Sequence, residues 1–149
     1  MTIKYVHTNL VASDWQGLAE FYIKVFGCKA KPPERNLKGP WLDSLTSLKN
    51  VHVRGVHLVM PGCGRSGPTL EIFQYSGRRR RTLPQTDQPG FGHIAFAVTN
   101  VGQLIKRLEK NGGSLAGKRI TTTIERVGKL DVVYARDPEG NIVELQKWS

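Results

Sequence analysis

The sequence predicts an α+β fold made of two similar modules, each with one strand, one helix and then three strands. A strand-and-helix pattern that includes His7 recurs at His93, 86 residues later. A strand with one central glutamate occurs at Glu71 and again at Glu144, 73 residues later. Self-similarity of this kind indicates a repeated structural unit, so both halves of the chain should share one architecture.

The first module is predicted over residues 1–76 and the second over 91–149, with a basic linker over 77–90. The two repeat spacings differ by 13 residues, so the first module should carry an insertion of about that length. The irregular stretch near 35–49 is where the insertion fits. Because a module of ~70 residues has a marginal core on its own, we expect the two modules to pair.

The length and composition limit the class of protein. The chain has 149 residues, and 39% of them are hydrophobic, which is enough for a globular core. No apolar run approaches the ~18 residues of a membrane span, and the first residues lack the apolar core of a signal peptide. We therefore expect a soluble cytoplasmic protein. Cys28 and Cys63 are expected to be unpaired thiols.

The first module should begin with a strand over residues 3–11. Ser13, with Gln16 three residues later, predicts a capping box at the start of a helix. Apolar residues at helical spacing follow, and Gly27 suits the left-handed residue that ends many helices. The remaining elements expected here are strands over 28–31, 51–60 and 69–75 and a short helix over 40–45.

The second module repeats this order. A strand over residues 92–98 contains His93, and Thr99 or Asn100 should cap a helix that ends at Gly112–Gly113. The later strands are expected over 120–127, 130–136 and 142–148, with a tight turn at Gly128–Lys129 between the first two.

Period-two alternation predicts which strand residues share a face. Glu71 and Glu144 are both flanked by apolar residues, which should point to the opposite, core side of each sheet. The same holds for His7 and His93. A buried carboxylate must be paired or bind a metal, and imidazole with carboxylate suits Zn, Ni, Co, Mn or Fe. A structural hydrogen bond would explain each residue taken singly, but their recurrence at matching positions favours one divalent metal site.

Two segments, Gly92–Val98 and Tyr134–Leu145, resemble the vicinal oxygen chelate superfamily, the glyoxalase-fold proteins, and the resemblance covers nearly the whole chain. It implies that the curved mixed sheets of two βαβββ modules form a half-barrel around one metal site. It also implies that the metal ligands come from the first and last strands of each module. The residues at those positions are His7, Glu71, His93 and Glu144.

This ligand set resembles that of glyoxalase I and of methylmalonyl-CoA epimerases. It implies a metal-dependent lyase or isomerase that abstracts a proton next to a carbonyl, with the enediolate stabilised by Zn, Ni, Co or Mn. Glu144 is the expected base, and Glu71 could serve the opposite face. His57 and Arg54 are candidate pocket residues, although a buried structural role suits either. The alternatives in the same superfamily are a thiol transferase, a dioxygenase that uses Fe, or a protein that binds a small molecule without turnover.

The net charge of +10 bears on the partners of the protein. Arg78–Arg81 matches a nucleic-acid patch by pattern alone, but no nucleic-acid fold signature accompanies it, so a solvated linker is favoured. These arginines, with Lys118 and Arg119, could instead attract a small anionic substrate such as a glutathione or coenzyme A thioester. The resemblance further implies a homodimer, and the insertion near 35–49 leaves the substrate open because family members shape their pocket there.

Overall fold

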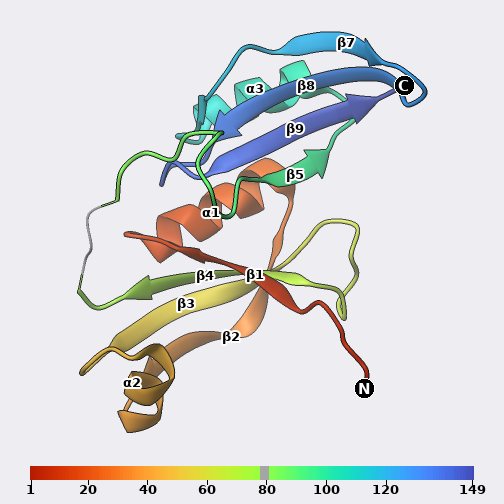
Figure 1. Cartoon of the computed structure of the whole chain (residues 1–149). Helices are drawn as coiled ribbons and strands as arrows, with labels where there is room; N and C mark the ends of the chain where they lie inside the picture. The colour runs from red at the N-terminus through yellow and green to blue at the C-terminus, as the bar shows by residue number, and fades with distance from the viewer. Residues whose placement is uncertain (78–80) are drawn as a thin grey trace. The chain divides into compact units, whose positions relative to one another are not determined.

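The computed structural model describes residues 1–77 and 81–149, and the chain divides into two compact units, Met1–Arg80 and Arg81–Ser149. Each unit contains one mixed sheet and at least one helix, which confirms the predicted α+β class (Figure 1). The predicted module limits at 76 and 91 stay predictions. No helix among the described residues is long and apolar enough to cross a membrane.

The first unit has a four-stranded sheet in the order β1-β4-β3-β2. Strands β1 and β4 are parallel, and the other two pairings are antiparallel. The elements are β1 (His7–Val11), α1 (Trp15–Phe26), β2 (Lys29–Lys38), α2 (Pro40–Thr46), β3 (His52–Val59) and β4 (Thr69–Tyr75).

Helix α1 buries its apolar stripe against β3 and β4. Leu18, Tyr22 and Val25 are fully buried, as their helical spacing predicts. The helix ends at Gly27, whose φ of 74° is the left-handed conformation expected there. The predicted cap at Ser13 is wrong by one residue, because the side chain of Asp14 accepts the hydrogen bond from the backbone N–H of Gly17.

Two strands of the first unit differ in length from the prediction. The first strand begins at His7 rather than at residue 3, and the preceding residues are exposed. Strand β2 continues to Lys38 instead of ending at residue 31, with a shift in its pairing to β3 between Lys31 and Arg35. The start of the stretch predicted to be irregular, residues 35–38, is therefore strand at the edge of the sheet.

Helix α2 confirms the short helix expected over 40–45, and it supplies a small apolar cluster of its own. Leu42 packs with Val53 of β3 and Phe73 of β4, and all three side chains are buried. By strand alternation, Val53 and Phe73 lie on the same face of the sheet as Glu71. The helix therefore covers one end of that face with apolar side chains.

The second unit has a five-stranded sheet in the order β5-β9-β8-β6, and β7 also pairs with β8. Strands β5 and β9 are parallel, and the other pairs are antiparallel. The elements are β5 (Ile94–Ala97), α3 (Val101–Lys110), β6 (Ser114–Leu115), β7 (Ile120–Ile124), β8 (Gly128–Arg136) and β9 (Ile142–Trp148).

Asn100 caps helix α3, as one of the two expected residues, by accepting a hydrogen bond from Gln103 N–H. The prediction missed β6, which is only two residues long. It also placed a turn at Gly128–Lys129, whereas β8 starts at Gly128 and the reversal lies over residues 125–127. There the backbone N–H of Val127 bonds the carbonyl of Ile124, and Arg126 takes a positive φ.

The internal repeat extends to the register of the sheets. In the first unit Asn9 is the partner of Glu71 across the parallel pair, and in the second unit Ala95 is the partner of Glu144. Asn9 and Ala95 are 86 residues apart, the same spacing that separates the two histidines. Strands β1 and β4 of the first unit are therefore paired in the same register as β5 and β9 of the second unit.

Candidate functional site

Each unit has its central glutamate on the sheet face opposite its apolar core, as alternation predicts. The residues that flank Glu71 and Glu144 are at most 1% exposed. The carboxylate side chains are partly buried, with exposed fractions of 12% for Glu71 and 14% for Glu144. Carboxylates this far from solvent need polar partners, and the structure supplies them from neighbouring strands.

Three side chains surround Glu71 in the first unit. Nε2 of His57 lies 2.9 Å from Oε1 of Glu71, and the amide of Asn9 donates to Oε2 at 2.8 Å. Nε2 of His7 lies 3.6 Å from the same Oε2 atom. The two strands that neighbour β4, β1 and β3, therefore direct polar groups at both oxygens of this carboxylate.

The ring of His57 is held between two polar groups. Its Nδ1 atom lies 3.1 Å from Oγ1 of Thr69, on the opposite side of the ring from Glu71. Burial lowers the pKa of His57 below its ordinary value, against the opposing effect of Glu71, and Arg35, His7 and Lys31 add to the lowering. A neutral imidazole ring carries one N–H group, and the carboxylate of Glu71 requires it on Nε2. The Nδ1 atom therefore accepts a hydrogen bond from the hydroxyl group of Thr69.

The second unit pairs Glu144 with one histidine and one tyrosine. Nε2 of His93 lies 3.0 Å from Oε2 of Glu144. Tyr134, the direct partner of Glu144 on β8, is hydrogen-bonded to it, and its ring centroid lies 5.0 Å from that of His93. Burial raises the pKa of Tyr134, and the charge and hydrogen bond of Glu144 raise it further. The phenol therefore keeps its proton and donates a hydrogen bond to the carboxylate.

The two glutamates thus have equivalent positions but different neighbours. On the antiparallel side, His57 stands opposite Glu71 and Tyr134 stands opposite Glu144. On the parallel side, the amide of Asn9 contacts Glu71, whereas Ala95 offers Glu144 no hydrogen bond. Glu71 is therefore the more firmly held of the two carboxylates.

Each unit brings one predicted histidine and one predicted glutamate together, His7 with Glu71 and His93 with Glu144. Among the described residues, no group of three or more His, Cys, Asp or Glu side chains is arranged to hold a metal ion. The set of four ligands therefore stays a prediction. Its donor atoms, imidazole nitrogen and carboxylate oxygen, nevertheless suit a divalent metal chemically.

The sequence predicts only part of the surroundings of these pairs. His57 was expected only as a candidate pocket residue and Tyr134 was not expected, because the register of two strands is needed to place either one beside a glutamate. Arg54, the other candidate, is the partner of Gln74 on the face opposite Glu71. It is therefore not beside the carboxylate.

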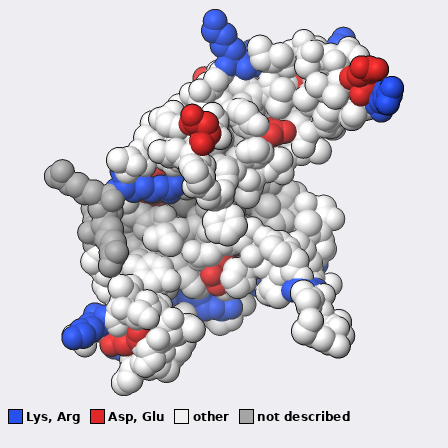
Figure 2. Space-filling model, viewed as in Figure 1, with Lys and Arg blue, Asp and Glu red and all other residues white. Residues whose placement is uncertain are grey.

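The basic residues proposed to attract a substrate are partly engaged elsewhere. Arg119 binds Asp131 through two hydrogen bonds of 2.7 and 2.6 Å, and this contact lowers the pKa of Asp131. Arg81 donates to the side chain of Asn141 at 2.7 Å, and residues 78–80 lie outside the described part of the chain. Lysine and arginine side chains are exposed on both units, as the face drawn in Figure 2 shows.

Comparison with known proteins agrees with this architecture. The family model of the Glyoxalase/Bleomycin resistance protein/Dioxygenase superfamily matches residues 4–145. No curated protein sequence matches the chain significantly.

Solved structures share the fold at low sequence identity. A glyoxalase family protein from Bacillus cereus is 17% identical, with a TM-score of 0.82, and the match covers 99% of this chain and 95% of that one. A glyoxylase/bleomycin resistance protein/dioxygenase domain from Frankia sp. is 18% identical, with a TM-score of 0.63 over the whole of both chains. A glyoxalase I mutant from Zea mays is 20% identical, with a TM-score of 0.65, over 96% of this chain and 44% of that one.

These structural matches are evidence of fold alone, whereas the family match spans nearly the whole sequence and includes both Glu71 and Glu144. The chain belongs to the Glyoxalase/Bleomycin resistance protein/Dioxygenase superfamily, also called the vicinal oxygen chelate superfamily.

Proposed function

We propose that this protein is a metal-dependent lyase or isomerase of the glyoxalase I or epimerase type, which moves a proton next to a carbonyl group. The observation that carries the proposal is the repeated histidine–glutamate pair. His7 lies beside Glu71 in one unit and His93 beside Glu144 in the other, at equivalent positions of the repeat. A purely structural role would not require the same two residue types at both positions.

In this proposal His7, Glu71, His93 and Glu144 together hold one divalent ion. The preferred ions are Zn, Ni, Co and Mn, which accept nitrogen and oxygen ligands of this kind. When bound, the ion would supply Lewis acidity to the oxygens of a substrate carbonyl. Asn9 and His57 would orient Glu71, and Tyr134 would orient Glu144, as outer partners commonly do for ligating carboxylates.

The unequal neighbours of the two glutamates support a division of roles. Both carboxylate oxygens of Glu71 have a polar partner, Oε1 the imidazole of His57 and Oε2 the amide of Asn9. This arrangement suits a carboxylate that is held in place. Glu144 lacks the amide partner, since Ala95 stands where Asn9 does in the first unit. We therefore assign the proton-accepting role to Glu144, with the hydroxyl of Tyr134 holding its orientation.

The substrate in this proposal is a small anionic thioester or hemithioacetal, for example one built on glutathione or coenzyme A. The net charge of +10 would favour the approach of such a molecule. We also propose that the protein acts as a homodimer, as the family resemblance implies.

The decisive variant is Glu144→Gln, which keeps the size of the side chain and removes its basicity. Exchange of the substrate proton with deuterated water should be followed for a hemithioacetal and for a 2-methyl-branched acyl thioester. We expect Glu144→Gln to lower the exchange rate by about 10²- to 10⁴-fold. His52→Gln is the matched control, because His52 contacts Asn36 and neither glutamate. Undiminished exchange in Glu144→Gln would contradict the assignment of the base.

Elemental analysis of the purified protein tests the metal part separately. About one equivalent of Zn, Ni, Co or Mn that survives dialysis supports the lyase or isomerase reaction. Iron together with oxygen-dependent activity would favour a dioxygenase of the same superfamily instead. No bound metal, and no uptake from solution, would contradict the metal site as a whole.

A further inference from the structure

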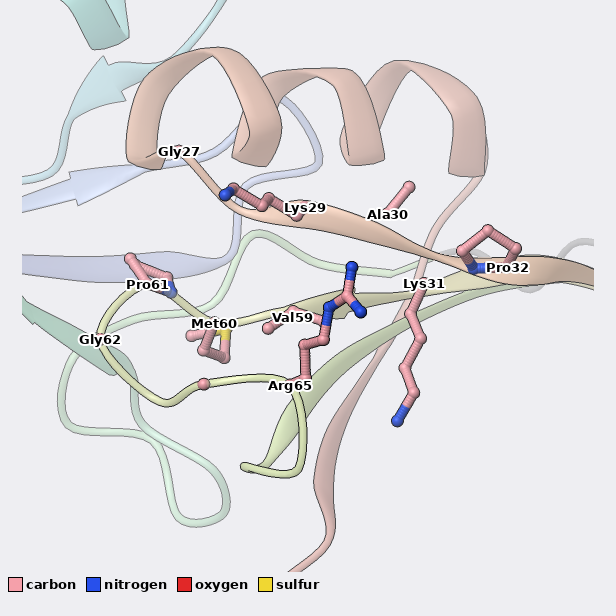
Figure 3. A pocket seen from close by; sticks show the side chains of 11 residues that line it. Gly27, Lys29, Ala30, Lys31, Pro32, Val59, Met60, Pro61, Gly62 and Arg65 are labelled. Atoms are coloured by element: carbon pink, nitrogen blue, oxygen red, sulfur yellow. The ribbon is translucent and has the colours of Figure 1, made fainter.

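A basic cavity lies at one end of the first-unit sheet, beside the face that carries Glu71. Its volume is about 490 Å³, and it is enclosed by the start of β2, the end of β3 and the loop over residues 60–65 (Figure 3). Lys29 and Lys31 contribute from β2, and Arg65 contributes from the loop. In Figure 3 the side chain of Arg65 reaches from the loop toward β2.

The charges around this cavity are not neutralised by the protein. Its lining includes three cations, Lys29, Lys31 and Arg65, and no acidic residue. None of the three forms an ion pair with a carboxylate among the described residues. This contrasts with Lys24, which pairs with Glu20, and with Arg119, which pairs with Asp131. Unpaired cations that line one cavity favour an anionic occupant.

The rest of the lining is mainly apolar. Val59, Met60 and Pro61 form one side, and Ala30 and Pro32 lie on the strand opposite. Ligand sites commonly combine an apolar wall with a few polar groups that fix the charged end of the ligand. The cavity therefore suits a molecule with an apolar section that ends in a phosphate or a carboxylate.

Lys31, which lines the cavity, belongs to the row of side chains that contains Glu71. Lys31 is the direct partner of His57 across β2 and β3, and His57 is the direct partner of Glu71 across β3 and β4. Direct partners share a sheet face, and neighbouring strands lie ~4.8 Å apart, so Lys31 and Glu71 are separated by roughly 10 Å along this row. That span matches a ligand that reaches from the cavity to the carboxylate.

The opposite end of the same face is mainly apolar, and Arg35, the strand partner of Gly55, lies between this end and His57. The α2 cluster of Leu42, Val53 and Phe73 covers it, and the ring of Phe73 contacts that of His57 at a centroid distance of 6.0 Å. A ligand at Glu71 would therefore have the apolar cluster and one cation, Arg35, on one side and the three cations of the cavity on the other. This gives the ligand one preferred direction along the sheet.

We propose that the cavity binds the remote end of the substrate, an apolar section that ends in a phosphate or carboxylate, through Lys29, Lys31 and Arg65. The reacting end would then lie at Glu71. The statement that this ligand is the substrate rests on the proposed function, whereas binding of the anion to the cavity does not.

Binding of four probes to the full chain, measured by isothermal titration calorimetry, tests the proposal. The probes are hexyl phosphate, hexanoate, hexanol and inorganic phosphate. We expect hexyl phosphate or hexanoate to bind more tightly than hexanol and inorganic phosphate, because only these two offer both an apolar section and a charge. Whichever of the two binds more tightly identifies the anion.

Charge-removing variants locate the site. Lys31→Met and Arg65→Met should each weaken binding of the better probe by about fivefold, and the double variant by about 20-fold. Arg65→Lys keeps the charge and should retain most of the affinity. Lys38→Met is the matched control, because Lys38 is an exposed lysine on the same strand that does not line the cavity. All of these residues but Arg65 lie in β2, so circular dichroism should verify that the sheet is intact.

Equal binding of hexanol and hexyl phosphate, or unchanged affinity in the double variant, would overturn the proposal. Loss of affinity in Lys38→Met equal to that in Lys31→Met would also overturn it, since it would indicate general charge attraction. If the probes and variants behave as expected but the protein exchanges no thioester proton, the anion site in the cavity is supported and the proposed reaction is contradicted.

Discussion

The surroundings of Glu71 and Glu144 differ in single residues. Alternation in the sequence was enough to turn Glu71 and Glu144 away from the core, and the structure confirms both orientations. It was not enough to name their cross-strand partners, since these depend on register. His57 and Tyr134 occupy corresponding positions and differ in chemistry, so the repeat itself gave no indication of either.

Cys28 allows a prediction about pH at this scale. Burial raises the pKa of its thiol from 9.0 to about 11, partly opposed by a backbone hydrogen bond. The folded state therefore holds the thiol proton more tightly than the unfolded state, and this contribution is present below pH ~9 and lost as the pH rises toward ~11. A shift of this size corresponds to roughly 2 to 3 kcal/mol of unfolding free energy.

Urea unfolding at pH 8 and pH 10.5 measures this loss. The wild type should lose more stability between the two values than Cys28→Ala, in which the titrating thiol is absent. Cys63→Ala is the control and should behave like the wild type, because Cys63 is exposed. Equal losses in Cys28→Ala and the wild type would show that the buried thiol makes no such contribution.

Secondary-structure elements were predicted well in type and less well at their ends. Both long helices, the insertion helix and the paired glutamate strands confirm the sequence interpretation. The errors have local physical causes. Ser13 and Asp14 are both good capping residues, and only the backbone path selects Asp14. Strand β2 runs through Pro32 and Pro33 to Lys38, because an edge strand tolerates prolines that a central strand would not.

The cap of α1 can be tested directly. Asp14→Ala removes the acceptor for the Gly17 N–H and should lower the free energy of unfolding by about 1 kcal/mol. Asp14→Ser retains a capping oxygen and should lose only a few tenths of that amount. The measurement is urea denaturation followed by circular dichroism. A larger loss in Asp14→Ser than in Asp14→Ala would contradict the capping role.

At the scale of the whole molecule, the repeat was the most informative feature of the sequence. The spacings of 86 and 73 residues predict two similar modules, and the described chain divides into two units whose paired strands have equivalent registers. The insertion near 35–49 stays a prediction, and the structure has β2 and α2 ahead of the strand that carries His57. What those residues cover could not be read from the sequence, because the Leu42 cluster joins three separate elements.

If one metal draws its ligands from both units, its removal should affect the stability of the whole chain. Saturating metal should raise the melting temperature by about 5 to 10 °C, from ~2.7 kcal/mol of binding linkage at 100 times Kd. Glu71→Gln and Glu144→Gln should each remove most of this gain, although they lie in different units.

Differential scanning calorimetry with and without a chelator provides the measurement. His52→Gln should retain the full gain and serves as the control. A gain that survives in one glutamate variant and disappears in the other would mean that the ion belongs to a single unit.

Strand β2 has a further consequence for how the protein avoids uncontrolled self-association. It is the edge strand of its sheet, and an exposed edge is a template on which strands of other copies can add. Pro32 and Pro33 lack the N–H groups that such pairing needs, and Lys29, Lys31 and Lys38 place like charges along the same strand. Lys29 and Lys31, which line the cavity, thus also oppose aggregation at this edge of the sheet. Substituting them to change the ligand that the cavity prefers should therefore lower the solubility of the protein.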